Sequence, residues 1–141
     1  AWASKQKIRG VDVAGLGGTN WTRIEGIVQG KDYAVYENLG KRTKEAVESA
    51  RSHLRRDQHV IASGGIRTGL DMAKAFGLGA DLVGMALPFL KWAAQSVDEV
   101  VSGVNRLREE LRVAMWFTGS RTPGDLSGKI GEGRSSPYHL V

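Results

Sequence analysis

The chain has 141 residues, of which 41% are hydrophobic and 25% are charged, and these are ordinary values for a soluble globular domain. Because it has no cysteine, a disulfide scaffold, a thiolate nucleophile and a zinc site with cysteine ligands are all excluded. No apolar run approaches the roughly 20 residues of a membrane span, and no signal peptide precedes the first predicted strand, so we expect a cytoplasmic protein without a membrane partner.

The charge is basic, with 20 lysines and arginines against 15 acidic residues and a formal net charge of +5. The basic residues are spread along the sequence rather than gathered in one tract, which favours a solvated helix surface over a nucleic-acid-binding face. The sequence opens A-W-A-S-K-Q-K-I-R-G without a methionine and runs at once into an apolar stretch. We therefore expect a fragment of a longer protein.

Three short apolar runs, each followed by glycine, are predicted strands, and they span residues 11–14, 60–62 and 82–86. They are continuous rather than alternating runs, which is typical of parallel strands covered on both faces. Helical periodicity predicts helices in the segments 43–56, 68–76 and 96–115. We expect a short helical turn in T-G-S-R-T-P-G-D-L, one folded unit over residues 1–127, and a flexible tail over 128–141.

Capping residues mark the predicted helix starts. Thr43 is expected to cap the first helix. T-G-L-D, starting at Thr68, has the shape of a capping box with Asp71 in the place of the usual Glu, and Ser96 with Glu99 repeats that pattern. The resulting order is strand and helix in alternation, which indicates a parallel α/β sheet.

Two architectures fit this order. An open three-stranded sheet would leave both of its edges exposed, whereas a TIM barrel, (β/α)8, typically needs about 250 residues. The predicted fold class is therefore α/β, as the C-terminal part of a TIM barrel comprising about its last three βα units.

The glycine-ended strands predict a phosphate site. In such barrels the loops after the last two strands and a helix N-terminus hold a phosphate through backbone N–H groups. Gly64 and Gly65 allow close approach because they have no Cβ, and the helix at Thr68 follows at once. Arg67 can add charge-assisted hydrogen bonds. The alternative for S-G-G is a tight turn between strand and helix with no ligand.

The first strand also ends in glycines, in D-V-A-G-L-G-G-T-N-W. This is not the dinucleotide fingerprint, because the last glycine of G-x-G-x-x-G is missing and no helix clearly opens there. Thr19 is a candidate to offer its hydroxyl and amide to the same anion, although a plain turn explains the segment as well. Asp12, inside the strand, is interpreted as a satisfied buried acceptor rather than a base.

Three sequence blocks resemble a known family. V-D-V-A-G-L-G-G-T-N-W-T-R-I-E, the block from V-I-A-S-G-G-I-R to G-M-A-L-P-F-L, and E-E-L-R-V-A-M-W-F-T-G are similar to the C-terminal part of type 2, FMN-dependent, isopentenyl diphosphate isomerases. They come in the family's order and cover most of residues 8–128. The run G-G-I-R-T-G-L-D-M-A-K-A-F-G-L-G-A-D also resembles the FMN-dependent 2-hydroxy acid oxidases and dehydrogenases, which are the alternative.

The resemblance implies FMN bound at the C-terminal rim of a TIM barrel. Ala14 stands where many family members carry Ser, so one hydroxyl that would reach the cofactor is missing. Trp21, Trp92 and Trp116 are interpreted as packing residues. The cofactor-binding residues implied by the motif match are Thr19, Gly64, Gly65, Ile66, Arg67, Ala86 and Leu87.

The implied reaction moves the double bond of isopentenyl diphosphate to give dimethylallyl diphosphate, with FMN, NADPH and Mg²⁺ as cofactors. The catalytic and metal-binding residues would lie in the N-terminal part of the barrel, so the expected partners are that part or further copies of the chain. His53, His59 and His139 lack metal-ligand spacing, and no metal site is predicted within the chain. The alternative in another class is a non-catalytic phosphate-binding or flavin-binding fragment.

Overall fold

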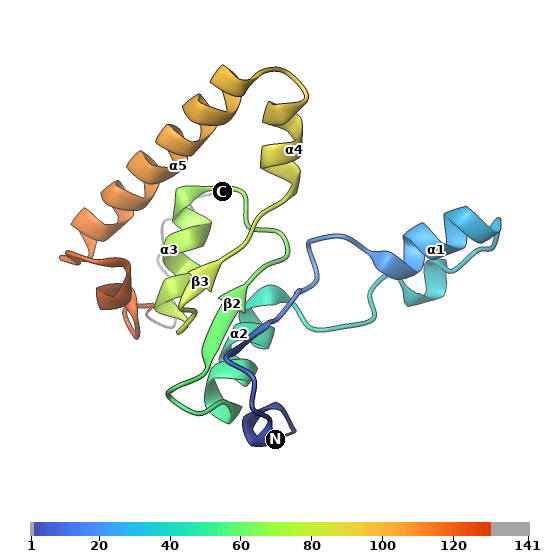
Figure 1. Ribbon diagram of the computed structural model, residues 1–141, viewed down its shortest axis with the longest axis horizontal. Helices are drawn as coiled ribbons and strands as arrows, with labels where there is room; N and C mark the ends of the chain where they lie inside the picture. Colours follow the sequence, from blue (N-terminus) through green and yellow to red (C-terminus); the bar gives the residue numbers. More distant parts are fainter. Residues whose placement is uncertain (1, 131–141) are drawn as a thin grey trace, which may run out of the picture.

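A computed structural model describes residues 2–130 of the chain, and Figure 1 shows their arrangement. A parallel sheet has the strand order β1-β2-β3, with β1 at Gly10–Asp12, β2 at His59–Ala62 and β3 at Leu82–Val83. The helices are α1 (Trp21–Gln29), α2 (Thr43–His53), α3 (Gly69–Gly77), α4 (Leu87–Ala93) and α5 (Val97–Phe117), with 3₁₀ turns at Ala3–Lys5, Ala34–Tyr36 and Pro123–Leu126. The predicted alternation of parallel strands and helices is confirmed.

The outer strands are shorter than predicted. β1 ends at Asp12 because Ala14 turns into the left-handed region with φ +43°, and β3 has a strand on one side only. Pairing continues one residue past β3, where the N–H of Gly84 donates to the carbonyl of Ala62. The central strand, β2, has a neighbour on both sides and is the longest.

The helix starts agree with the sequence in two of three cases. Thr68 and Asp71 form the predicted capping box of α3, and the Ser96 hydroxyl accepts the N–H of Glu99 at the start of α5. Thr43 was wrongly predicted as a cap: the N-cap of α2 is Arg42, without a side-chain cap, because the Thr43 hydroxyl is bonded elsewhere. The predicted turn near the end is confirmed as the 3₁₀ turn Pro123–Leu126.

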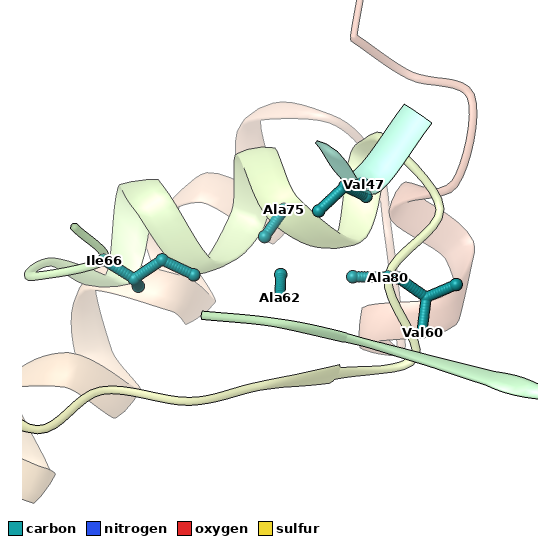
Figure 2. Packing of buried hydrophobic residues seen from close by; sticks show 6 residues of the cluster. All are labelled: Val47, Val60, Ala62, Ile66, Ala75 and Ala80. Atoms are coloured by element: carbon teal, nitrogen blue, oxygen red, sulfur yellow. The ribbon is translucent and has the colours of Figure 1, made fainter. Parts of the chain in front are cut away.

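The core lies between the sheet and the helices α2 and α3. Figure 2 shows Ala62 of β2 facing Ala75 of α3, with Val47 of α2 nearby. On the opposite sheet face the register aligns Asp12, Ile61 and Leu82, and the first and last of these are exposed. Within the described chain the sheet is therefore covered on one face, not on both as the continuous apolar runs predicted.

Two helices were missed by the sequence reasoning. α1 opens directly after G-L-G-G-T-N, where no helix was expected, because the Asn20 side chain accepts the N–H of Arg23 as an N-cap. Figure 1 shows α1 projecting away from the sheet on the β1 side. α4 has Pro88 in its first turn and packs against α5, where the Trp92 ring lies against Gly103. The missed signals were an N-cap asparagine and an N-terminal proline.

The tryptophan prediction holds for one of its three residues. Trp92 packs as expected, but Trp21 and Trp116 are 74% and 76% exposed. Both were interpreted as packing residues, and in the described chain no element covers them. The predicted flexible tail, 128–141, lies outside the described residues except for its first three. Of these, the N–H of Gly128 donates to the carbonyl of Gly77.

Candidate phosphate site

The loops that follow β1 and β2 lie in direct contact. The N–H of Gly15 donates to the carbonyl of Ser63 at 3.0 Å, and a Cβ on Gly64 would lie 2.1 Å from the carbonyl oxygen of Gly15. Gly64 and Gly65 have φ values of +95° and +79°, which side chains rarely adopt. These glycines are therefore required for the approach of one loop to the other, whether or not an anion binds.

The loop after β2 still offers unused donors. Among the described residues, the N–H groups of Gly64, Gly65 and Ile66 have no acceptor, and Ile66 is 6% exposed. The guanidinium of Arg67 is exposed, and residues 2–130 provide it with no hydrogen bond or ion pair. We refer to these three consecutive amides and the guanidinium that follows them in the chain as the cradle, because they are donors of the kind that bind phosphate.

The N-terminus of α3 does not provide the expected amides. The Asp71 carboxylate accepts the N–H groups of Arg67 and Thr68, at 3.2 and 3.1 Å. Glu110 of α5 accepts the N–H of Gly69 at 2.6 Å. Two carboxylates of the chain therefore already occupy this helix end, which corrects the prediction that a phosphate would bind there.

The loops after β2 and β3 lie side by side, as predicted. A Cβ on Gly84 would lie 3.3 Å from the Cβ of Ser63, so the chain leaves both strands at the same edge of the sheet. Ala86 is the N-cap of α4 and Leu87 its first residue. Their N–H groups have no acceptor in the part of the chain that is described, as is usual at a helix start.

A cavity of about 1010 Å³ opens beside the loops after β1 and β2, between the α1 segment, α2 and α3. Four of the predicted site residues line it: Thr19, Gly64, Gly65 and Ile66. Arg67, Ala86 and Leu87 lie outside this lining. The structure thus brings the predicted residues to one edge of the sheet but not into one cavity.

Two contacts at the site were not anticipated from the sequence. The Thr43 hydroxyl donates to the carbonyl of Gly64 at 2.5 Å, and the Ser63 hydroxyl donates to the Asp12 carboxylate. Asp12 is an acceptor, as expected, but it is exposed rather than buried. Each contact joins residues more than 20 positions apart, and no local sequence pattern reports such a pairing.

The described residues contain neither a metal-holding cluster of side chains nor a membrane-spanning helix. His53 and His59 are exposed, and His139 lies outside the described range. Within residues 2–130, no group of three or more histidine, aspartate and glutamate side chains is placed to hold a metal ion. None of the helices between residues 2 and 130 has the length and apolar character required to span a membrane.

The chain belongs to the FMN-dependent dehydrogenase family, whose model matches residues 40–131. This match covers the loops after β2 and β3, where the free amides and Arg67 lie. A family defined by FMN agrees with a cradle suited to a phosphate group.

More specific similarity is to proteins named isopentenyl-diphosphate delta-isomerase, which confirms the resemblance seen in the sequence blocks. The relative from Legionella pneumophila (strain Corby) is 41% identical over 128 residues, which cover 86% of this chain and 37% of the relative. The Paracoccus zeaxanthinifaciens relative is 44% identical, covering 84% and 36%. The Bdellovibrio bacteriovorus relative is 39% identical, covering 89% and 38%. The chain thus spans little more than a third of these relatives.

Solved structures of oxidases share the fold. Mandelate oxidase with (S)-2-phenylpropionate matches with a TM-score of 0.57 and 31% identity, over 60% of this chain and 26% of the oxidase. A putative lactate oxidase from Pediococcus acidilactici matches with a TM-score of 0.65 over 89% of this chain and 30% of the oxidase. At 23% identity, the second likeness concerns the fold alone.

Proposed function

We propose that residues 1–127 form the C-terminal part of a TIM barrel, comprising about its last three βα units. The open face of the sheet, lined by Asp12 and Leu82, would be the interior wall of the barrel. β1 and β3 each have one free edge in the described chain, where a barrel continues with further strands. The family match and the likeness to oxidase structures support this arrangement.

The function that the site supports best is binding of the FMN phosphate. The observation that carries this proposal is the row of free N–H groups at Gly64, Gly65 and Ile66 beside the unpaired Arg67. Thr19 would contribute from the loop after β1, and the amides of Ala86 and Leu87 would contribute from the start of α4. The N-terminus of α3 would not contribute to phosphate binding, because the carboxylates of Asp71 and Glu110 occupy that end.

The complete protein would convert isopentenyl diphosphate into dimethylallyl diphosphate. The 39–44% identity to relatives named for this activity supports the proposal. Reduced FMN, when bound, would supply the proton transfer that moves the double bond. This chain's residues would bind and orient the cofactor, while NADPH, Mg²⁺ and the substrate diphosphate would engage residues in the part of the barrel that this chain does not contain.

A 2-hydroxy acid oxidase is the second candidate, favoured by the 31% identity to mandelate oxidase. The isomerase relatives have higher identity over a larger share of the chain, so we prefer the isomerase. Flavin reduction distinguishes the two: mandelate or lactate added to the FMN-loaded complete protein without oxygen would bleach the flavin of an oxidase. The isomerase proposal expects no bleaching by either acid.

The test of the phosphate site is a flavin fluorescence titration of the chain with FMN and with riboflavin, which lacks the phosphate. We expect FMN to bind much more tightly. Arg67→Ala should weaken FMN binding by about 1.5 to 3 kcal/mol and leave riboflavin binding nearly unchanged. Arg106→Ala, which removes an exposed arginine of α5, is the matched control. Equal affinities for the two flavins would exclude a phosphate site.

A further inference from the structure

We propose that Asp12 is a positioning residue that fixes the two glycine loops of the phosphate site against each other. The proposal rests on the proposed function, because it assigns a role within that site. One carboxylate oxygen of Asp12, Oδ1, accepts the N–H of Ala14 at 2.9 Å and also accepts the Ser63 hydroxyl. Ala14 begins the loop after β1, and Ser63 begins the loop after β2.

The two bonds hold Ala14 and Ser63, and each of these residues directly precedes a glycine of the two loops in contact. Ala14 is held at φ +43°, an uncommon value for a residue with a Cβ, and Gly15 follows it. The N–H of Gly15 donates to the carbonyl of Ser63, so Ser63 is bound through both its side chain and its backbone. The free amides of Gly64, Gly65 and Ile66 follow immediately. Their direction therefore depends on the position of Ser63.

The surroundings of Asp12 argue against a role in core stability. The residue is exposed, and it lies on the face of the sheet opposite the core formed by Val47, Val60 and Ala62. The part of the chain that is described gives it no ion pair, and its hydrogen-bond partners there are Ala14 and Ser63. What its two hydrogen bonds determine is the geometry where the two loops begin.

Three variants of the 141-residue chain separate this role from a charge effect. Asp12→Ala and Ser63→Ala remove the link, and each should raise the FMN dissociation constant by about tenfold. Asp12→Asn keeps an acceptor oxygen, so it should stay within about threefold of the parent. Riboflavin affinity should not change in any variant. Ser52→Ala, which removes a hydroxyl at the C-terminal end of α2, is the control and should leave both affinities unchanged.

A second measurement needs no ligand. Amide hydrogen exchange at Gly15, whose N–H donates to the carbonyl of Ser63, should be faster in Asp12→Ala and Ser63→Ala than in the parent and unchanged in Ser52→Ala, with circular dichroism confirming the fold. If Asp12→Ala fails to fold, Ser63→Ala is the variant that tests the proposal. Parent-like exchange in folded Ser63→Ala, or a loss in Asp12→Asn as large as in Asp12→Ala, would overturn the proposal. If the parent does not prefer FMN to riboflavin, the proposed phosphate site is refuted, and the exchange data alone test the positioning role of Asp12.

Discussion

The hydroxyl of Thr43 donates a hydrogen bond to the carbonyl oxygen of Gly64 at 2.5 Å, and so joins the first turn of α2 to the loop after β2. The same hydroxyl approaches the carbonyl of Leu16 at 3.3 Å. The backbone of Thr43 also lies against Gly15, where an added Cβ would be 2.4 Å from the Thr43 Cα. Thr43 therefore lies behind both glycine loops and supports them.

Replacing Thr43 should weaken this support. Thr43→Val has nearly the same shape but no hydroxyl, and it leaves the part-buried carbonyl of Gly64 without a donor, so we expect a loss of about 1 to 2 kcal/mol in the free energy of unfolding. Thr43→Ser keeps the hydroxyl and should lose less. Urea unfolding followed by circular dichroism measures both. Equal stability of the valine and serine variants would exclude a stabilising role for the bond.

Gly64 should tolerate no side chain, even without a ligand. Gly64→Ala combines left-handed backbone with a Cβ 2.1 Å from the Gly15 carbonyl oxygen, and we expect it to cost about 2 to 5 kcal/mol. Gly30→Ala is the matched control, because Gly30 has φ +63° and nothing within 4 Å of an added Cβ. It should cost about 1 to 2 kcal/mol in the same urea unfolding experiment. Similar losses at the two sites would contradict the close loop contact.

This contact changes how glycine variants at the site are interpreted. If Gly65 served only to let a phosphate approach, Gly65→Val would abolish FMN binding by occupying the place of the phosphate. In the structure an added Cβ on Gly65 lies 3.3 Å from the backbone of Gly17. Such a variant would disturb the loops before it met a ligand, so Arg67→Ala is the cleaner probe of phosphate binding.

Local patterns predicted the parts of the fold that depend on neighbouring residues. The α3 capping box was predictable because Thr68 and Asp71 are three positions apart, and β2 because it is a continuous apolar run. The number of covered sheet faces was not predictable, since the same apolar run occurs whether the barrel is complete or only a part of it is present. The blocking of the α3 N-terminus also escaped prediction, because Glu110 comes from a helix 41 positions away.

The chain alone should not isomerise isopentenyl diphosphate. Positioning and charge neutralisation of the substrate diphosphate would come from residues outside this chain, and no metal-holding cluster of side chains occurs within its described range. The assay uses the purified 141-residue chain with FMN, NADPH and Mg²⁺, and follows the formation of dimethylallyl diphosphate. Turnover above background would show that this chain carries a complete active site.

The 3₁₀ turn Pro123–Leu126 should lose stability in acid. The Asp125 carboxylate accepts the N–H groups of Thr122 and Arg121, and these bonds hold its pKa below the ordinary value of 3.8. A carboxylate whose pKa is lower in the folded state than in the unfolded state stabilises the fold at pH values above its unfolded-state pKa. This contribution is lost as the pH falls through its folded-state pKa. Asp125→Asn should therefore be less stable than the parent near neutral pH, and the difference should shrink well below pH 3.8 in urea unfolding. A difference that does not depend on pH would contradict this account.

The chain should self-associate when no other part of a barrel is present. One face of α1 carries Trp21, Ile27 and Val28 at 74%, 72% and 75% exposure, and apolar surface of this kind commonly marks an interface. The free edges of β1 and β3 add unpaired backbone groups. We expect a dimer or a larger species in sedimentation experiments at micromolar concentration. A stable monomer under these conditions would contradict the prediction.

The α1 face can be tested separately from the strand edges. Ile27→Lys places a charge among the exposed apolar side chains and should shift the chain toward monomer by weakening association about tenfold or more. Gln29→Lys adds the same charge to the same helix away from the apolar stripe and should leave association unchanged. If both variants associate like the parent, the strand edges rather than α1 hold the assembly together. If both weaken association equally, net charge is the cause and the apolar face of α1 has no specific role.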